Sequence, residues 1–487
     1  MRLRDRLEPS HLFVVALLVA ILGVSLGPLS DGDAYWHVLI GQEIARSGRL
    51  SDLGNSWSLI TPAHGWQTSQ WGFEYFMGWI VHIWNWSALI WMRTLLAIAF
   101  LAYLALSLLP RKSARSNTES FTPLAALVAL FLVTVPTTHA LQERPMLASF
   151  IALVWLSSAV YNQLVNGIQP RWYVVAAVVL LWSNLHGMWV LAPAMFGLVS
   201  LGLLLDRAEN FKTQALTAAR LTLIAAVAGC ISPLGPRGLL LPFSFHSATA
   251  YIEEWQPVRF FSSQAAGLIA LVLITIFIWA RRKQRLPLSQ VLILVLLLIF
   301  GMTAYRNILP ASILVAPFAV AAMGSTSLLR ARPGTVEQRK ALAVVSTVFL
   351  LASACGVVYV NARVNPLAKT TPLAIAQKLA AIDGPKRVLN NYNASGVLAA
   401  FGGSDLKLAI DGRADRDGGD YIKQYLNAES LIGPWKDLVN SVNPNYAVLA
   451  SDSALAQELL THQSWTLISR DGEFTLLKAP AVGPKVR

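Results

Sequence analysis

The stretch PLSQVLILVLLLIFGMT at residues 287–303, followed by ILPASILVAPFAVAAMGSTS at residues 308–327, decides the fold class of this chain. Neither run contains a charged residue, and only AYRN separates them. A helix needs about 20 mostly apolar residues to cross the hydrocarbon core of a bilayer. The two runs are therefore typical of two membrane-spanning helices joined by a short turn.

Similar apolar runs recur between short polar breaks from residue 12 to about residue 360. We interpret the first of them as a retained span, because it is long and no small-residue cleavage site follows it. The chain is 55% hydrophobic and only 13% charged, whereas soluble proteins carry about 25% charged residues. The sequence thus predicts a polytopic α-helical membrane protein. Its expected transmembrane helices, about eleven in number, lie at 12–28, 88–109, 121–138, 147–166, 172–185, 188–205, 217–234, 263–280, 287–303, 308–327 and 341–360.

Residues 362–487 differ from the transmembrane domain at 1–361, because charged residues return there to the density of a soluble protein. Helical and strand patterns alternate in this tail, which predicts a small α/β domain. The run DGRADRD at 411–417 is typical of a solvated turn, and a contact with carbohydrate or a partner is the alternative. The expected helices lie near 372–383, 394–401, 419–428, 434–441 and 453–461, and the expected strands near 388, 408, 446–449, 465–469 and 474–478.

Basic residues predict the orientation of the chain in the membrane. The formal net charge is +13, and the excess lies in loops between apolar runs, which indicates membrane topology rather than nucleic-acid binding. If the N-terminus is cytoplasmic, the outer loops before the tail contain no lysine. The positive-inside rule therefore predicts a cytoplasmic N-terminus and a C-terminal domain on the outer face. The two cysteines, Cys230 and Cys355, both lie in apolar runs and do not identify the compartment.

Two of the predicted outer segments are long, at 29–87 and 235–262. The first contains the amphipathic stretch Tyr35–Arg46 and the aromatic-rich run Trp66–Trp86. Amphipathic, tryptophan-rich helices of this kind lie flat in the membrane interface. We expect such interfacial helices between residues 29 and 87.

The heptapeptide Asp31-Gly32-Asp33-Ala34-Tyr35-Trp36-His37 follows the first predicted span on its outer side. Carboxylates near a low-dielectric region have raised pKa values and act as bases, and a pair of them can hold a divalent cation. The alternative is a polar loop with interfacial aromatic residues. The residues alone leave both interpretations open.

The chain resembles the GT-C class of membrane glycosyltransferases, and more closely a group of bacterial membrane proteins with GT-C-like organisation. The resemblance spans nearly the full length, through short motifs of moderate specificity. Those motifs are Asp31–His37 with Gly41, Gln70-Trp71, Arg144-Pro145, Leu181–Gly187, Ser232–Gly235, Glu254-Trp255, Tyr305–Asn307 and Asp411–Arg413.

The resemblance implies a catalytic base in the first outer loop, at Asp33 or Asp31, and it does not decide between them. It also implies a lipid-phosphate leaving group, whose charge arginine side chains neutralise well. The candidate phosphate-binding residues are Arg144, Arg306, Arg237 and His186. Members of the class differ in metal use, so Asp31 and Asp33 are also the candidate ligands of a Mg²⁺ or Mn²⁺ ion, should one be used.

Further residues are candidates for substrate binding, each with a structural alternative. An arginine at a helix end can snorkel to the interface, a histidine between apolar runs can be satisfied by a backbone carbonyl, and an interfacial tryptophan can serve as an anchor. Ionisable residues inside a membrane are nevertheless functional candidates by default. The substrate-binding candidates are His37, Tyr35, Trp36, Asn184, Glu143, Glu254 and Trp255.

The function that the resemblance implies is transfer of a sugar, with inversion, from a polyprenyl-phosphate donor to an extracytoplasmic glycan, lipid or protein acceptor. The setting would be the bacterial inner membrane, with a role in building cell-envelope polysaccharide. Two alternatives are a transporter or flippase of a lipid-linked substrate and a non-enzymatic envelope-assembly protein. The acids cluster at one surface and no internal repeat is found, which disfavours a transporter.

Overall fold

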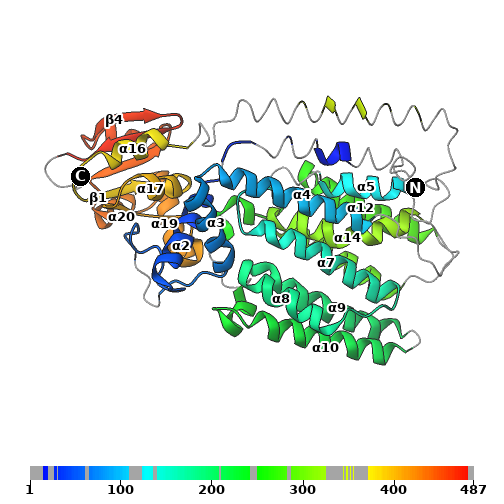
Figure 1. The fold of residues 1–487 in the computed structure, drawn as a ribbon. Coiled ribbons are helices and arrows are strands. Elements are labelled where there is room, and N and C mark those ends of the chain that lie inside the picture. Colours follow the sequence, from blue (N-terminus) through cyan, green and yellow to red (C-terminus); the bar gives the residue numbers. More distant parts are fainter. Residues whose placement is uncertain are drawn as a thin grey trace.

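The computed structural model describes a helix bundle, two helices at one of its ends, and a sheet domain beyond them (Figure 1). Most of the expected first and last spans, at 12–28 and 341–360, lies outside the described residues. The described residues are 15–19, 23, 27–29, 31–60, 65–108, 123–134, 140–207, 210–241, 249–281, 287–324, 340, 344, 347, 348, 351, 352, 355 and 371–480.

Apolar helices pack side by side in the bundle (Figure 1). Helix α14 lies at its centre, and nearly all of its side chains are buried. Many of them are alanine or glycine, which let neighbouring helices approach closely. The helices are α4 (Ala88–Leu108), α5 (Pro123–Thr134), α7 (Met146–Val165), α8 (Trp172–Leu185), α9 (Leu191–Asp206), α10 (Phe211–Gly229), α12 (Ser263–Ala280), α13 (Leu288–Thr303) and α14 (Ile308–Gly324).

Five helices within the described residues are long and apolar enough to cross a membrane, which makes the chain a multi-pass membrane protein. The expected number of about eleven is not confirmed. Helix α10 covers part of the expected span 217–234, but Lys212, Gln214 and Arg220 make it less apolar. The five are Ala88–Leu108, Met146–Val165, Gly187–Asp206, Ser263–Ala280 and Tyr305–Gly324, and Leu124–Thr134, Trp172–Leu185 and Leu288–Thr303 are shorter apolar helices.

The tail folds as a five-stranded sheet with helices, as predicted. The strand order is β2-β1-β3-β5-β4, in which β1 pairs parallel with β2 and β3, while β5 pairs antiparallel with β3 and β4. The strands are β1 (Lys386–Asn390), β2 (Leu406–Leu408), β3 (Tyr446–Ala450), β4 (Thr466–Asp471) and β5 (Phe474–Lys478). The helices are α16 (Leu373–Ala380), α17 (Ser395–Phe401), α18 (Ala414–Asp417), α19 (Gly419–Glu429), α20 (Trp435–Val442) and α21 (Ala454–Thr461).

Helices α2 (Asp33–Ser47) and α3 (Trp71–Trp84) lie between the bundle and the sheet domain (Figure 1). They approach closely because Gly41 has no side chain: a Cβ atom there would overlap the carbonyl oxygen of Glu74. Helix α3 leaves Phe76, Trp79 and Trp84 exposed. These exposed aromatic side chains suit a helix lying at the membrane interface, which stays a prediction.

The segment between α2 and α3 extends the edge of the sheet. Ser58 forms a parallel bridge with Leu408, the last residue of β2. The Leu59 amide donates to the Leu408 carbonyl at 2.8 Å, and the Leu408 amide donates to the Trp57 carbonyl at 2.7 Å. Lys407 Nζ also donates to the Asn55 carbonyl at 2.8 Å. The N-terminal part of the chain thus pairs with backbone groups that an edge strand would otherwise leave open.

Candidate active site

The two acids of the heptapeptide lie at the start of α2, at the end of the bundle next to the sheet domain. Asp31 is buried just before the helix and accepts a hydrogen bond from the Asp33 amide at 3.0 Å. Asp33 is the first residue of α2, where the helix dipole favours a carboxylate. Its Oδ1 atom accepts a hydrogen bond from Trp36 Nε1 at 2.9 Å.

Arg144, in the loop before α7, binds three carboxylates at once. It contacts Asp31 through two hydrogen bonds, from Nη2 to Oδ1 at 2.8 Å and from Nε to Oδ2. Its Nη2 atom also lies 3.1 Å from Asp33 Oδ2. Its Nη1 atom donates to Glu254 Oε2 at 2.9 Å. One guanidinium group therefore joins the start of α2 to the segment around Glu254, more than 200 residues further along the chain.

Glu254 links Arg144 to a second arginine. Glu254 and Trp255 belong to the short helix η5 (Glu253–Trp255), and Arg306 belongs to η6 (Tyr305–Asn307). Arg306 Nη1 lies 3.6 Å from Glu254 Oε1. Its guanidinium carbon lies 4.2 Å from the centre of the Trp255 ring, a cation–π contact. Backbone hydrogen bonds between 256–258 and 302–305 hold the two short helices together.

We call the six side chains of Asp31, Asp33, Arg144, Glu254, Trp255 and Arg306 the carboxylate–arginine cluster. Its ionisable members differ in exposure. The side chain of Asp33 is 26% exposed and that of Glu254 33%, whereas that of Asp31 is only 2% exposed. A molecule arriving from solvent can therefore reach Asp33 and Glu254, while Asp31 is occupied in holding Arg144.

The pKa values of the two partly exposed acids, Asp33 and Glu254, are shifted in opposite directions. Burial raises the pKa of Asp33 above its ordinary value, and the guanidinium of Arg144 only partly offsets this. Burial also acts on Glu254, but Arg144 and Arg306 outweigh it and hold the pKa of Glu254 below its ordinary value. Asp33 is thus the weaker acid of the two, and a better proton acceptor once ionised.

His37 and Trp36 lie beside the cluster. Their rings are in contact, with centroids 3.6 Å apart and planes tilted by 37°. His37 Nδ1 donates to Glu74 Oε1 at 2.9 Å, and Thr68 Oγ1 donates to Glu74 Oε2 at 2.7 Å. Glu74 is fully buried and is not among the site residues predicted from the sequence. Burying an acid inside the aromatic run 66–86 costs free energy unless the acid has polar partners. The presence of Glu74 in this run could therefore have marked it as a candidate.

Three predicted substrate-binding or phosphate-binding residues have other surroundings. Tyr35 is fully buried and its ring packs against Trp86 and Phe401. Asn184 accepts a hydrogen bond from Trp71 Nε1 at 2.7 Å, which ties α8 to α3. His186 follows α8 directly, its Nδ1 atom lies 2.7 Å from Ser149 Oγ, and its side chain is buried. Tyr35 and Asn184 therefore have structural contacts that do not involve the carboxylate–arginine cluster.

Glu143 and Arg237 form no ion pair with the cluster among the described residues, although the Glu143 carboxylate lies close enough to Asp31 and Arg144 to interact with their charges. Glu143 is fully buried and pairs with Arg93 of α4, which donates to the Gly27 carbonyl as well. This pair fixes the residue that precedes Arg144 in the chain. Arg93 is an ionisable residue within a predicted span, and that position alone marks it as a candidate. Arg237 is exposed in η3 (Gly235–Leu240) and has no contact with the cluster.

Arg144 occupies the position that a divalent cation would need between Asp31 and Asp33. Both oxygens of Asp31 accept from Arg144, and each oxygen of Asp33 already has a partner. No group of three metal-ligating side chains occurs within the described residues. The two acids as arranged do not fit a Mg²⁺ or Mn²⁺ site unless Arg144 is displaced, and metal use stays an untested prediction.

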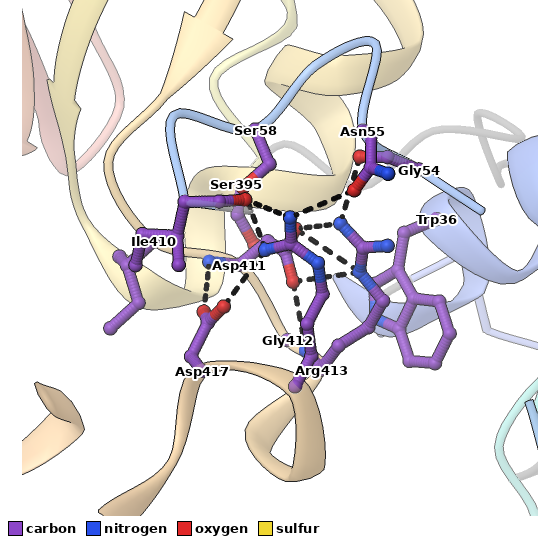
Figure 2. A network of polar contacts seen from close by, with 12 residues as sticks. Trp36, Gly54, Asn55, Ser58, Ser395, Ile410, Asp411, Gly412, Arg413 and Asp417 are labelled. Atoms are coloured by element: carbon purple, nitrogen blue, oxygen red, sulfur yellow. Dashed lines mark hydrogen bonds and ion pairs between the residues drawn. The ribbon is translucent and has the colours of Figure 1, made fainter. Parts of the chain in front are cut away.

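The run 411–417 of the sheet domain is not the solvated turn expected from the sequence (Figure 2). Asp411, Arg413 and Arg416 are buried. Arg413 pairs with Asp411 and donates to the carbonyls of Leu53 at 2.7 Å and Gly54 at 3.1 Å. The expectation failed because the turn packs against the segment 53–60, which sequence periodicity does not reveal.

Comparisons with known proteins identify the fold. No family model and no curated protein matches the sequence. The structure of ArnT from Cupriavidus metallidurans bound to undecaprenyl phosphate is similar, with a TM-score of 0.53 at 15% identity, covering 97% of this chain and 98% of that one. ArnT in the apo state gives a TM-score of 0.50 at 14% identity, covering 96% and 97%. Because ArnT is a GT-C glycosyltransferase, this chain has a GT-C-like fold over nearly its full length.

Proposed function

From this GT-C-like fold we propose that the chain is a membrane glycosyltransferase, which moves a sugar from a polyprenyl-phosphate donor to an acceptor hydroxyl. The observation that carries the proposal is the carboxylate–arginine cluster. It places a partly exposed carboxylate, Asp33, within one ion-pair network with two arginines, Arg144 and Arg306. A proton acceptor next to cations that bind phosphate is what this reaction requires.

Asp33 is the proposed base. It takes the proton from the acceptor hydroxyl while that oxygen attacks the anomeric carbon of the sugar. The bond between this carbon and the lipid-phosphate oxygen breaks, the phosphate leaves with the electron pair, and the configuration inverts. Asp31 is a less suitable base, because it is almost fully buried and both of its oxygens accept hydrogen bonds from Arg144.

Arg144 and Arg306 are the proposed phosphate-binding residues. Guanidinium groups match phosphate oxygens geometrically and stay charged at all physiological pH values. Their side chains are 21% and 19% exposed, so an arriving phosphate can compete with Glu254 for both. The ring of Trp255 offers an apolar face on which a sugar can pack. The likeness in fold to ArnT, whose structure was determined bound to undecaprenyl phosphate, supports a lipid of this class and a bacterial inner-membrane setting.

The direct test uses purified chain in detergent with undecaprenyl phosphate as the probe. We expect undecaprenyl phosphate to raise the melting temperature, and undecaprenol, which lacks the phosphate, to have no effect. When a sugar-loaded form of the same lipid and a hydroxyl-bearing acceptor are both added, lipid phosphate should be released only when the chain is present. Absence of both effects would refute the proposal. Uptake of the lipid across vesicles without a covalent product would instead indicate a flippase, and binding alone would fit an assembly protein.

Transfer should also depend on pH through Asp33. A base works only when deprotonated, so activity is lost as the pH falls through its pKa. Because burial raises the pKa of Asp33, this loss should begin at a higher pH than for an exposed aspartate. The measurement is the initial rate of lipid-phosphate release as a function of pH, with melting temperatures recorded at each pH to exclude unfolding. A rate that stays constant down to the ordinary pKa of aspartate would contradict this role.

A further inference from the structure

The sheet domain contacts the proposed base directly. Gly412 lies against Asp33 and Trp36: a Cβ atom built on Gly412 would overlap Asp33 Oδ1 and would lie 2.6 Å from Trp36 Nε1. These are the acceptor and donor of the hydrogen bond that orients the Asp33 carboxylate. The backbone of Gly412 therefore closes one side of this bonded pair.

Close approach, and not backbone conformation, explains the glycine at this position. Gly412 does not have the positive φ angle that favours glycine. Alanine would be acceptable to the backbone but would collide with Asp33 and Trp36. A substitution at this position thus probes the contact with the carboxylate and little else.

The position of Gly412 is fixed from both sides. Arg413 lies between the rings of Trp57 and Trp66, with its guanidinium carbon 5.2 and 5.0 Å from their centres. Arg416 donates to Ser58 Oγ at 2.7 Å, and Tyr392 Oη donates to the Gly412 carbonyl at 3.4 Å. Figure 2 shows the polar contacts of Asp411, Arg413 and Asp417 in this turn, with Trp36 of α2 beside them. The turn that carries Gly412 is therefore anchored to the segment before α3.

A second contact between glycines holds Gly32, the residue that precedes Asp33. A Cβ atom on Gly32 would lie 2.5 Å from the Asn393 carbonyl oxygen, and one on Gly396 would overlap the Gly32 carbonyl oxygen. The sheet domain thus packs closely on Gly32 through Gly396 and on Asp33 through Gly412, at the start of α2. Substitution by any larger residue would push the domain away from Asp33.

We propose that the sheet domain supplies a positioning residue, Gly412, whose missing side chain lets the turn at 411–413 hold the Asp33 carboxylate against Trp36 and Arg144. The domain is then a wall of the active site and not a separate appendage. The inference rests on the proposed role of Asp33 as the base. Its geometric part, the orientation of the carboxylate, can be measured without transfer.

The test is Gly412→Ala, with the carboxyl of Asp33 titrated by carbodiimide labelling and mass spectrometry across pH. The charged or titratable groups near Asp33 are Asp31, His37, Arg144, Arg306 and Tyr392. Displacing the carboxylate from Trp36 and Arg144 removes interactions that favour its charged form. The labelling midpoint should therefore shift by about one pH unit, upward where the lost interactions dominate and downward where the carboxylate becomes more exposed, because burial is the largest influence on the pKa of Asp33. The acid limb of the transfer rate should move in the same direction.

The matched control is Gly402→Ala in the same domain. It also has an ordinary negative φ, and its added Cβ would lie 2.5 Å from the Leu398 carbonyl oxygen, away from Asp33. An unchanged midpoint in Gly412→Ala, or an equal shift in Gly402→Ala, would overturn the inference. If the unmodified chain transfers no sugar but the midpoint shift is confined to Gly412→Ala, the proposed function is refuted. The positioning of Asp33 by Gly412 is then still supported.

A second comparison covers the case in which Gly412→Ala does not fold. Trp36→Phe removes the indole nitrogen that the new methyl group would meet, while the contact with Asp33 Oδ1 remains. The double variant Trp36→Phe/Gly412→Ala should therefore fold more readily, and its labelling midpoint should differ from that of Trp36→Phe. Equal midpoints in these two variants would also overturn the inference.

Discussion

Asp33→Asn is expected to reduce sugar transfer by about 10²–10⁴-fold, the usual contribution of a general base. Asparagine has nearly the same size, and its Oδ1 atom can still accept from Trp36, so the fold should survive. It cannot accept the proton of the acceptor hydroxyl. The measurement is the rate of lipid-phosphate release, together with the melting-temperature shift caused by undecaprenyl phosphate, which should be retained.

The control for Asp33→Asn is Asp420→Asn, which makes the same change at an exposed acid in the first turn of α19. Its transfer rate should match that of the unmodified chain. Asp31→Asn should act by loosening Arg144 and not by removing the base. Its transfer rate should therefore still fall at low pH as Asp33 becomes protonated. Full transfer by both Asp33→Asn and Asp31→Asn would exclude the heptapeptide as the source of the base.

Arg144→Gln is expected to cost both activity and stability. Loss of the charge that faces the leaving phosphate should slow transfer by about 10²–10³-fold. The nearly buried carboxylate of Asp31 would also lose its bidentate partner. Breaking one partner of a buried ion pair typically costs about 3–5 kcal/mol of folding free energy. The melting temperature in detergent should fall accordingly.

A double variant separates the two effects of Arg144. In Asp31→Asn/Arg144→Gln both partners are neutral amides that can hydrogen bond to each other, so most of the lost stability should return. Transfer and binding of undecaprenyl phosphate should stay low, because the phosphate still has no guanidinium at this position. If the double variant regained transfer, Arg144 would be a structural residue and the phosphate-binding role would be wrong.

Local patterns in the sequence predicted local structure well. Helices α8 and α12 have the bounds that apolar run lengths gave, and the strands of the tail lie where alternation placed them. The number of spans is not confirmed, because α10 mixes polar and apolar residues and the outermost runs lie mostly beyond the described residues. Run length and alternation report on one element at a time, which is why they succeed for single helices and strands.

The cluster could be predicted as a set of residue types but not as a geometry. The motifs containing Asp31, Arg144, Glu254 and Arg306 were selected separately, and only the packing of four distant segments brings them together. For the same reason the sequence could not choose between Asp31 and Asp33, since the difference is one of burial. The contact of Gly412 with Asp33 joins residues about 380 positions apart and left no periodic signal.

The bridge between Ser58 and Leu408 has a consequence for how the molecule is made. These partners lie about 350 residues apart, so at about 5–20 residues per second a ribosome needs roughly 20–70 seconds to deliver the second after the first. During that interval the segment around Ser58 has no strand β2 to pair with, and the turn at 411–413 that forms one wall of the site has not been made. A nascent or prematurely terminated chain would therefore be inert, and chemistry would begin only once synthesis is complete.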